Sequence, residues 1–170
     1  MKQIQYKVKT LKSKKMAVRV SVNYNDPRWK RFDLARYVRL LVSKIVQIHQ
    51  IRLNYFSLSV LACSDLKIKE LNRQYREKNR VTNVLAWPAM HCFFNFDKDY
   101  QSYDKNNYLF LGDIAISYQR CLIEASSQNI QFDKHCCRLL VHAILHLLGY
   151  KHDISVRASK MQLMETRVLN

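Results

Sequence analysis

The amino-acid sequence predicts an α+β fold in which a small mixed β-sheet is packed with helices, forming a single domain over residues 1–170. Short runs of alternating or continuous apolar residues, typical of strands, are interspersed with longer runs whose apolar residues recur every three or four positions, as in helices. Apolar residues make up 48% of the chain, which excludes general disorder. The sequence contains no repeat and no glycine-rich or proline-rich linker, so we expect one core.

The first part of the chain predicts a strand, a helix and a second strand. Residues 16–22 alternate small or apolar side chains with polar ones, and residues 55–63 form a second run of strand-forming residues. Between them, Asp33 stands where it can cap a helix that continues to about His49. The later elements follow from the same patterns: a helix beginning at Ser64 or Asp65, an extended segment at 84–87 ended by Pro88, an irregular loop or hairpin at 89–106, a strand at 108–118, and helices at 119–127, 132–148 and 155–168.

The chain contains only two glycines, Gly112 and Gly149. Gly112 lies inside a strand pattern, where glycine often marks a bulge or a close approach of another backbone. Gly149 follows the last apolar residues of the helix expected at 132–148, where it can adopt a positive φ and end the helix. Both positions are expected to have backbone requirements that other residues do not meet.

Three histidines surround the second glycine. His142 and His146 are four residues apart, so both imidazoles can face one ion from the same side of a helix. A chain that turns back at Gly149 can bring His152 to them. Three nitrogen ligands favour a single zinc ion with one coordination position left open, as in catalytic rather than structural zinc sites. The sequence therefore predicts a metal site at the C-terminal end of the long helix.

The same spacing occurs in zinc proteases, which carry a glutamate directly after the first histidine as the base for water. Here that position is Ala143, which disfavours peptide hydrolysis.

His135 lies seven residues before His142, about 10 Å along a helix axis, and is too far away to bind the same ion.

The charge of the chain is strongly positive: 29 Lys and Arg against 13 Asp and Glu give +16. Such a balance favours a polyanionic partner, with RNA, DNA or an anionic membrane as candidates. No apolar stretch approaches the roughly 20 residues of a membrane helix, and we expect RNA rather than a membrane as the partner. Five cysteines without a CxxC pair argue against a disulfide framework, so we expect a reducing compartment and a cytoplasmic protein.

Three segments resemble the YbeY family of metal-dependent endoribonucleases: the histidine motif at 142–152, the block at 71–85 that ends in Thr-Asn-Val-Leu, and Leu-Gly-Asp-Ile at 111–114. The resemblance implies zinc on the three histidines and a functional arginine at Arg76. It also implies single-strand-type cleavage in the maturation of ribosomal RNA (the 16S 3′ end), ribosome quality control, and binding to the ribosome or its small subunit. The chain departs from the family at Ala143, Lys151 and Ala86-Trp87, none of which is a ligand.

The sequence leaves other interpretations of the metal site, of Arg76 and of two aromatic residues open. The zinc could instead stiffen a non-catalytic RNA-binding or ribosome-binding assembly factor, for which the same basic surface would serve. Without the resemblance, Arg76 would be an ordinary solvated arginine on a helix. Tyr75 and Trp87 could stack on unpaired bases, although aromatic side chains more commonly pack in a core.

Overall fold

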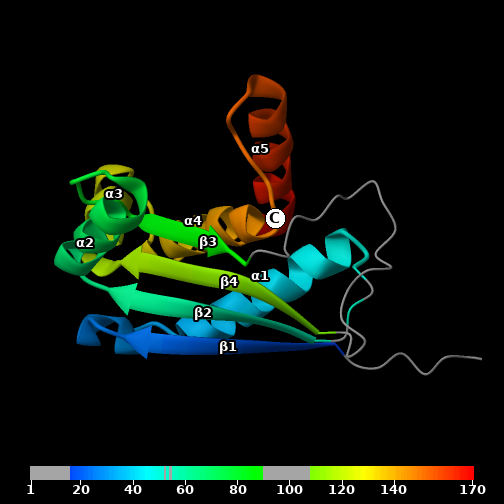
Figure 1. Cartoon of the computed structure of the whole chain (residues 1–170), viewed down its shortest axis with the longest axis horizontal. Coiled ribbons are helices and arrows are strands. Elements are labelled where there is room, and N and C mark those ends of the chain that lie inside the picture. Colours follow the sequence, from blue (N-terminus) through cyan, green and yellow to red (C-terminus); the bar gives the residue numbers. More distant parts are fainter. Residues whose placement is uncertain (1–15, 52, 54, 90–107) are drawn as a thin grey trace, which may run out of the picture.

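The computed structural model describes residues 16–51, 53, 55–89 and 108–170. Apart from residue 89, the loop or hairpin expected at 89–106 lies outside these residues. The elements follow the expected order (Figure 1): β1 (Ala17–Tyr24), the 3-10 helix η1 (Pro27–Arg31), α1 (Leu34–Ile48), β2 (Tyr55–Cys63), α2 (Asp65–Arg76), β3 (Val84–Pro88), β4 (Tyr108–Ser117), α3 (Tyr118–Ser127), α4 (Phe132–Leu147) and α5 (Ser155–Leu169).

The four described strands form one mixed sheet in the order β1-β2-β4-β3. β1 pairs with β2 and β2 with β4 in parallel, whereas β3 pairs antiparallel to β4 and forms one edge. The α+β class with a mixed sheet is thereby confirmed. None of the helices in the described part of the chain is long and apolar enough to span a membrane.

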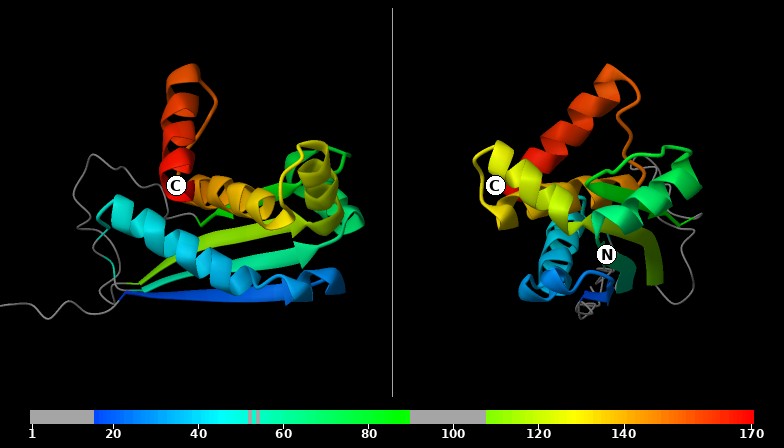
Figure 2. Two further views of the ribbon diagram at one scale, coloured as in Figure 1. Left: turned by 180° about the vertical axis from the view of Figure 1, so that it is seen from behind. Right: turned by 90° about the vertical axis from the view of Figure 1, so that its left-hand side faces the viewer.

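The helices are arranged unevenly around the sheet. α1 crosses the face turned away in Figure 1, and α4 lies along β3 and β4 (Figure 2). α2 and α3 sit together at the end of the sheet where β2 and β4 end, and α5 projects beyond α4. The largest fully buried side chains of the described residues come from the sheet, from η1 and from the helices that pack on the sheet: Trp29, Leu34, Ile45, Phe56, Leu58, Ile68, Leu85, Leu111, Ile114, Ile116, Leu140 and Ile144.

The helix starts are set by side-chain caps. The carboxylate of Asp33 accepts a hydrogen bond from the Arg36 N–H, as expected for α1. For α2 the cap is Ser64 rather than Asp65, because the Ser64 side chain accepts from the backbone of the first turn. The short helix η1 was not predicted. It begins with the sequence Asp26-Pro27, in which the Asp26 side chain caps the turn and proline suits the first position.

Gly112 produces a bulge in β4. The pairing register between β2 and β4 shifts here, so that Leu111 and Gly112 together stand opposite Leu58. Gly112 has φ +131°, and a Cβ at this position would overlap the carbonyl oxygen of Trp87 in β3. Both expectations for this glycine, a bulge and a close backbone approach, are confirmed.

Replacing Gly112 with alanine is expected to destabilise the fold by about 2 kcal/mol or more, because the variant combines an unfavourable φ with a backbone overlap. The measurement is urea unfolding followed by circular dichroism. Ser59→Ala, on the neighbouring strand and opposite Asp113, is the control and should change stability by less than about 1 kcal/mol. A Gly112→Ala variant as stable as this control would contradict the assignment of the bulge.

Candidate metal centre

The C-terminal end of α4 is shaped by Gly149. The buried Leu140, Ile144 and Leu147 hold one face of α4 in the core. The helix then ends in a Schellman arrangement: Gly149, at φ +89°, donates its N–H to the His146 carbonyl at 2.9 Å, and Tyr150 donates to the Leu145 carbonyl at 3.0 Å. The turn sends the following residues back along the helix.

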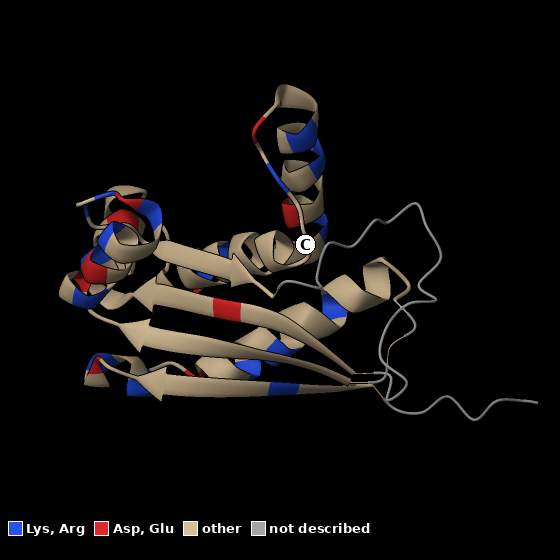
Figure 3. Ribbon diagram, in the orientation of Figure 1, with Lys and Arg blue, Asp and Glu red and all other residues tan. Residues whose placement is uncertain are grey.

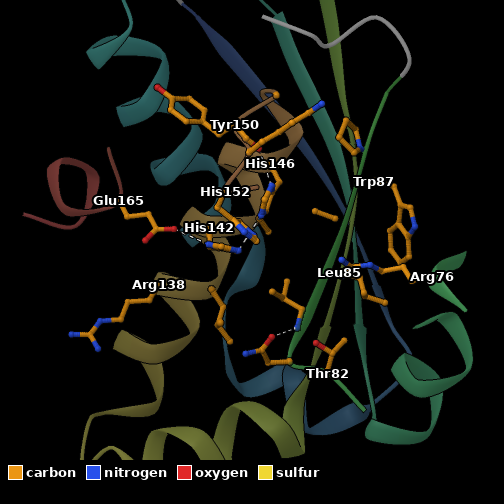
Figure 4. Close-up of a pocket in the computed structure, with 18 of the residues that line it drawn as sticks. Arg76, Thr82, Leu85, Trp87, Arg138, His142, His146, Tyr150, His152 and Glu165 are labelled. Atoms are coloured by element: carbon orange, nitrogen blue, oxygen red, sulfur yellow. Dashed lines mark hydrogen bonds and ion pairs between the residues drawn. The ribbon is translucent and has the colours of Figure 1, made fainter. Parts of the chain in front are cut away.

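This turn brings the three histidines together. One nitrogen from each of His142, His146 and His152 lies within 4.8 Å of the other two, so the cluster could hold a metal ion. The ring centroids are 4.6 Å apart for His142 and His146, 5.6 Å for His142 and His152, and 5.0 Å for His146 and His152. Figure 4 shows the three rings converging on one point of a cavity.

Two of the rings are held by their Nδ1 atoms. His146 Nδ1 lies 2.9 Å from the carbonyl oxygen of Tyr150, which can only accept, so Nδ1 carries the proton. His142 Nδ1 lies 2.7 Å from Oε1 of Glu165 in α5, a carboxylate that accepts in the same way. The Nε2 atoms of the two rings face each other across 3.1 Å. When both rings are neutral with the proton on Nδ1, these Nε2 atoms carry facing lone pairs, which a cation between them would bind, so this donor set fits a metal ion.

The protonation of His146 is consistent with this arrangement. Burial lowers its pKa to about 4, and the neighbouring His142 and Arg76 act in the same direction. His146 is therefore neutral at pH 7, the form in which histidine binds a metal.

The histidines line a cavity of about 880 Å³. Its walls come from the end of α2, the edge strand β3, α4, the turn after α4, and α5. Arg76, the last residue of α2, lies across the cavity from the histidines (Figure 4). Arg138 and Lys151 also line the cavity. Elsewhere Lys and Arg are spread over α1, α2 and α5 rather than gathered on one element (Figure 3).

The position of Arg76 is fixed by the way α2 ends. Glu77 adopts the left-handed conformation at φ +58° and donates its N–H to the carbonyl of Asn72. Asn72 is buried, and its side-chain amide donates to the Arg80 carbonyl at 2.8 Å. These bonds turn the chain toward β3 and leave the exposed Arg76 at the cavity rim.

A polar network holds the start of β3 at Asn83 and Val84. Asn83 accepts from the Val84 N–H through Oδ1 and donates through Nδ2 to Oε2 of Glu124 at 2.9 Å. The same Glu124 oxygen lies 3.0 Å from Nε2 of His135. His135 thus contacts α3, away from the other histidines. The network ties β3 to α3 and α4, and so fixes one wall of the cavity relative to the metal helix.

Sequence reasoning missed two parts of this site. Glu165 contacts His142 from 23 residues away, and no local pattern around either residue signals the contact. The partnership of Asn83 with Glu124 spans 41 residues and is likewise non-local. The only available sign was that metal-binding histidines commonly donate their other nitrogen to a carboxylate.

Known proteins resemble the chain over most of its length. The family model described as "Endoribonuclease YbeY" matches residues 19–170. A protein named endoribonuclease YbeY from Ruegeria sp. is 34% identical over 153 residues, covering 88% of this chain and 90% of its own length. One of the same name from Paracoccus denitrificans is 36% identical over 150 residues, covering 88% and 84%.

The fold is shared with a solved structure as well. The solution structure of a Thermotoga maritima protein superposes with a TM-score of 0.51 at 22% identity, covering 88% of this chain and 89% of the other. At this identity the likeness concerns the fold alone. The family match and the two relatives decide the assignment, as the motifs around Arg76, Gly112 and His146 had indicated. The chain belongs to the endoribonuclease YbeY family.

Proposed function

We propose that this chain is a zinc-dependent endoribonuclease that cleaves unpaired RNA in the maturation of small-subunit ribosomal RNA, with a part in ribosome quality control in the cytoplasm. The observation that carries the proposal is the cluster of three histidine nitrogens facing Arg76 across one cavity. The names of the relatives support RNA cleavage. The net charge of +16 supports a polyanionic substrate such as ribosomal RNA.

Zinc is the ion that suits this donor set. His142, His146 and His152 offer nitrogen only, whereas magnesium and calcium prefer oxygen. Three protein ligands leave a coordination position open for substrate or water. Bound zinc supplies Lewis acidity toward a phosphoryl oxygen.

The residues around the histidines bind the phosphate, orient a ligand and affect the choice of substrate. Arg76 binds and neutralises the phosphate, for which a planar guanidinium offers two parallel hydrogen bonds. Glu165 orients His142 and keeps its proton on Nδ1. Ala143 leaves no carboxylate at the position that activates water in zinc proteases, and this favours a phosphodiester over a peptide as substrate.

The proposal is tested with purified protein, unpaired and duplex RNA of matched length, and a chelator. Cleavage should require the metal, return when zinc is restored, and be faster for unpaired RNA. Cleavage that survives full removal of metal, verified by elemental analysis, would refute the role of zinc. Metal-dependent RNA binding without cleavage would instead indicate an assembly factor in which zinc is structural.

Replacing Glu165 with glutamine is expected to weaken zinc binding by about 10- to 100-fold, since this is the usual cost of losing a carboxylate behind a metal-binding histidine. Competition with a chromophoric chelator measures the affinity. The control is Glu124→Gln, which removes a carboxylate bonded to His135 and Asn83 but to none of the three clustered histidines. Unchanged zinc affinity in the Glu165 variant would show that the contact with His142 has no part in metal binding.

A further inference from the structure

Two aromatic side chains border the cavity on its α2 side. The rings of Tyr75 and Trp87 meet edge to face, with centroids 5.5 Å apart and an interplanar angle of 70°. Tyr75 is 58% exposed, so much of its ring faces solvent. Trp87 is partly buried against a small apolar cluster that contains Ile68 and Leu85, which gives the pair a rigid base. Both residues line the cavity of the three histidines.

The edge strand β3 separates this pair from the histidines. Side chains alternate between the two faces of a strand. Leu85 and Trp87 belong to the cluster beneath α2, whereas Val84 and Ala86 pack against the main core on the α4 side. Figure 4 shows Trp87 together with Arg76, opposite the three histidines. A phosphate held between Arg76 and the histidines would therefore lie over the sheet edge, with the neighbouring nucleotide free to reach the α2 side.

The chemistry of this side fits a nucleobase. Arg76 directly follows Tyr75 in α2, so a guanidinium and an exposed aromatic ring occur together at the cavity rim. An aromatic ring offers a stacking surface that accepts any base, because every base has a π-face. A base in a duplex already has both faces stacked and cannot use such a surface.

We propose that Tyr75 and Trp87 form a stacking subsite for one unpaired nucleobase, next to the phosphate that Arg76 binds. The inference rests on the proposed function and deepens it. The subsite would make the protein prefer unpaired RNA with little preference among the four bases, since it reads a π-face rather than hydrogen-bonding edges.

The first test measures binding without cleavage. The chain has two tryptophans, and Trp29 is 0% exposed, so quenching of fluorescence by acrylamide reports mainly on Trp87. Oligouridylate should protect Trp87 from the quencher, whereas an abasic oligomer of the same length and charge should not. Equal protection by the two oligomers would overturn the subsite, because both present the same phosphates.

The second test combines base removal with removal of the ring. In an unpaired RNA whose cleavage point has been mapped, an abasic nucleotide is placed on each side of that point in turn. For the wild type, base removal on one side should lower kcat/KM by roughly 10-fold, given the usual strength of base stacking on an aromatic side chain. In Tyr75→Ala the same removal should have little further effect, whereas Tyr75→Phe should keep the base dependence.

Tyr24→Ala serves as the matched control, because Tyr24 is also exposed but lies on β1, at the sheet edge opposite β3. Fully additive effects of Tyr75→Ala and base removal would overturn the subsite while leaving RNA cleavage intact. If the wild type cleaves no RNA but the base still protects Trp87, the proposed function fails and the subsite stands. The two failures are therefore distinguishable.

Discussion

His146→Ala is expected to abolish zinc binding and to lower kcat/KM for unpaired RNA by roughly three orders of magnitude or more, because the Lewis acid is lost from the site. Both ring nitrogens of His146 have partners. Its Nδ1 is held by the Tyr150 carbonyl and its Nε2 faces His142 across 3.1 Å. Elemental analysis of the purified variant gives the metal content, and initial rates at low substrate give kcat/KM.

The control for this variant is His135→Gln, on the same helix. His135 contacts Glu124 and none of the other described histidines, and glutamine can still donate to that carboxylate. The control should retain one zinc per chain and most of its activity, with some loss of stability because His135 is buried. If His146→Ala still carried one equivalent of zinc, the assignment of the three-histidine centre would be wrong.

Arg76→Ala is expected to lower kcat/KM by about 100-fold while zinc binding stays intact, which is the usual effect of removing one preorganised donor from a developing charge. Arg76→Lys should recover only part of this loss, because lysine keeps the charge but not the planar pair of donors. Because Arg76 is exposed at the cavity rim, the substitution leaves the core unchanged. Rates and zinc content are measured on the same preparations.

Arg73→Ala is the matched control for Arg76. It removes the same charge from the same helix, three residues away, at an exposed position outside the lining of the cavity. Its effect should be small and should vanish as salt is raised, as expected for a remote surface charge. Equal losses in the two variants would mean that Arg76 contributes only general attraction for RNA.

The sequence was most informative where the determinants of structure are local. The 142–152 segment contains the C-terminal end of α4, the glycine that ends it and three histidines within eleven consecutive residues, so their convergence follows from helix geometry and one residue with positive φ. The bulge at Gly112 was predictable for the same reason. Helix α1 also followed from local features, since its apolar face lies within its own residues and its cap, Asp33, directly precedes them.

Non-local contacts were not predictable in this way. The pairing of Glu165 with His142 depends on how α5 docks against α4, and that docking depends on buried residues such as Met161 and Met164. The expectation for Arg76 came from the resemblance, because nothing in a helical pattern says which cavity its last residue borders. The helix η1 was not predicted, because a segment of five residues is too short to show a helical period of apolar residues.

The bond between Glu165 and His142 has a thermodynamic consequence for α5. This helix projects from the body of the molecule and supplies the carboxylate behind one of the clustered histidines. Metal binding and the docking of α5 are therefore linked equilibria, and each must strengthen the other by the same factor. Loading the centre with metal should slow proteolysis between α4 and α5, and loosening α5 at Met161 or Val168, which are not among the three histidines, should weaken metal affinity.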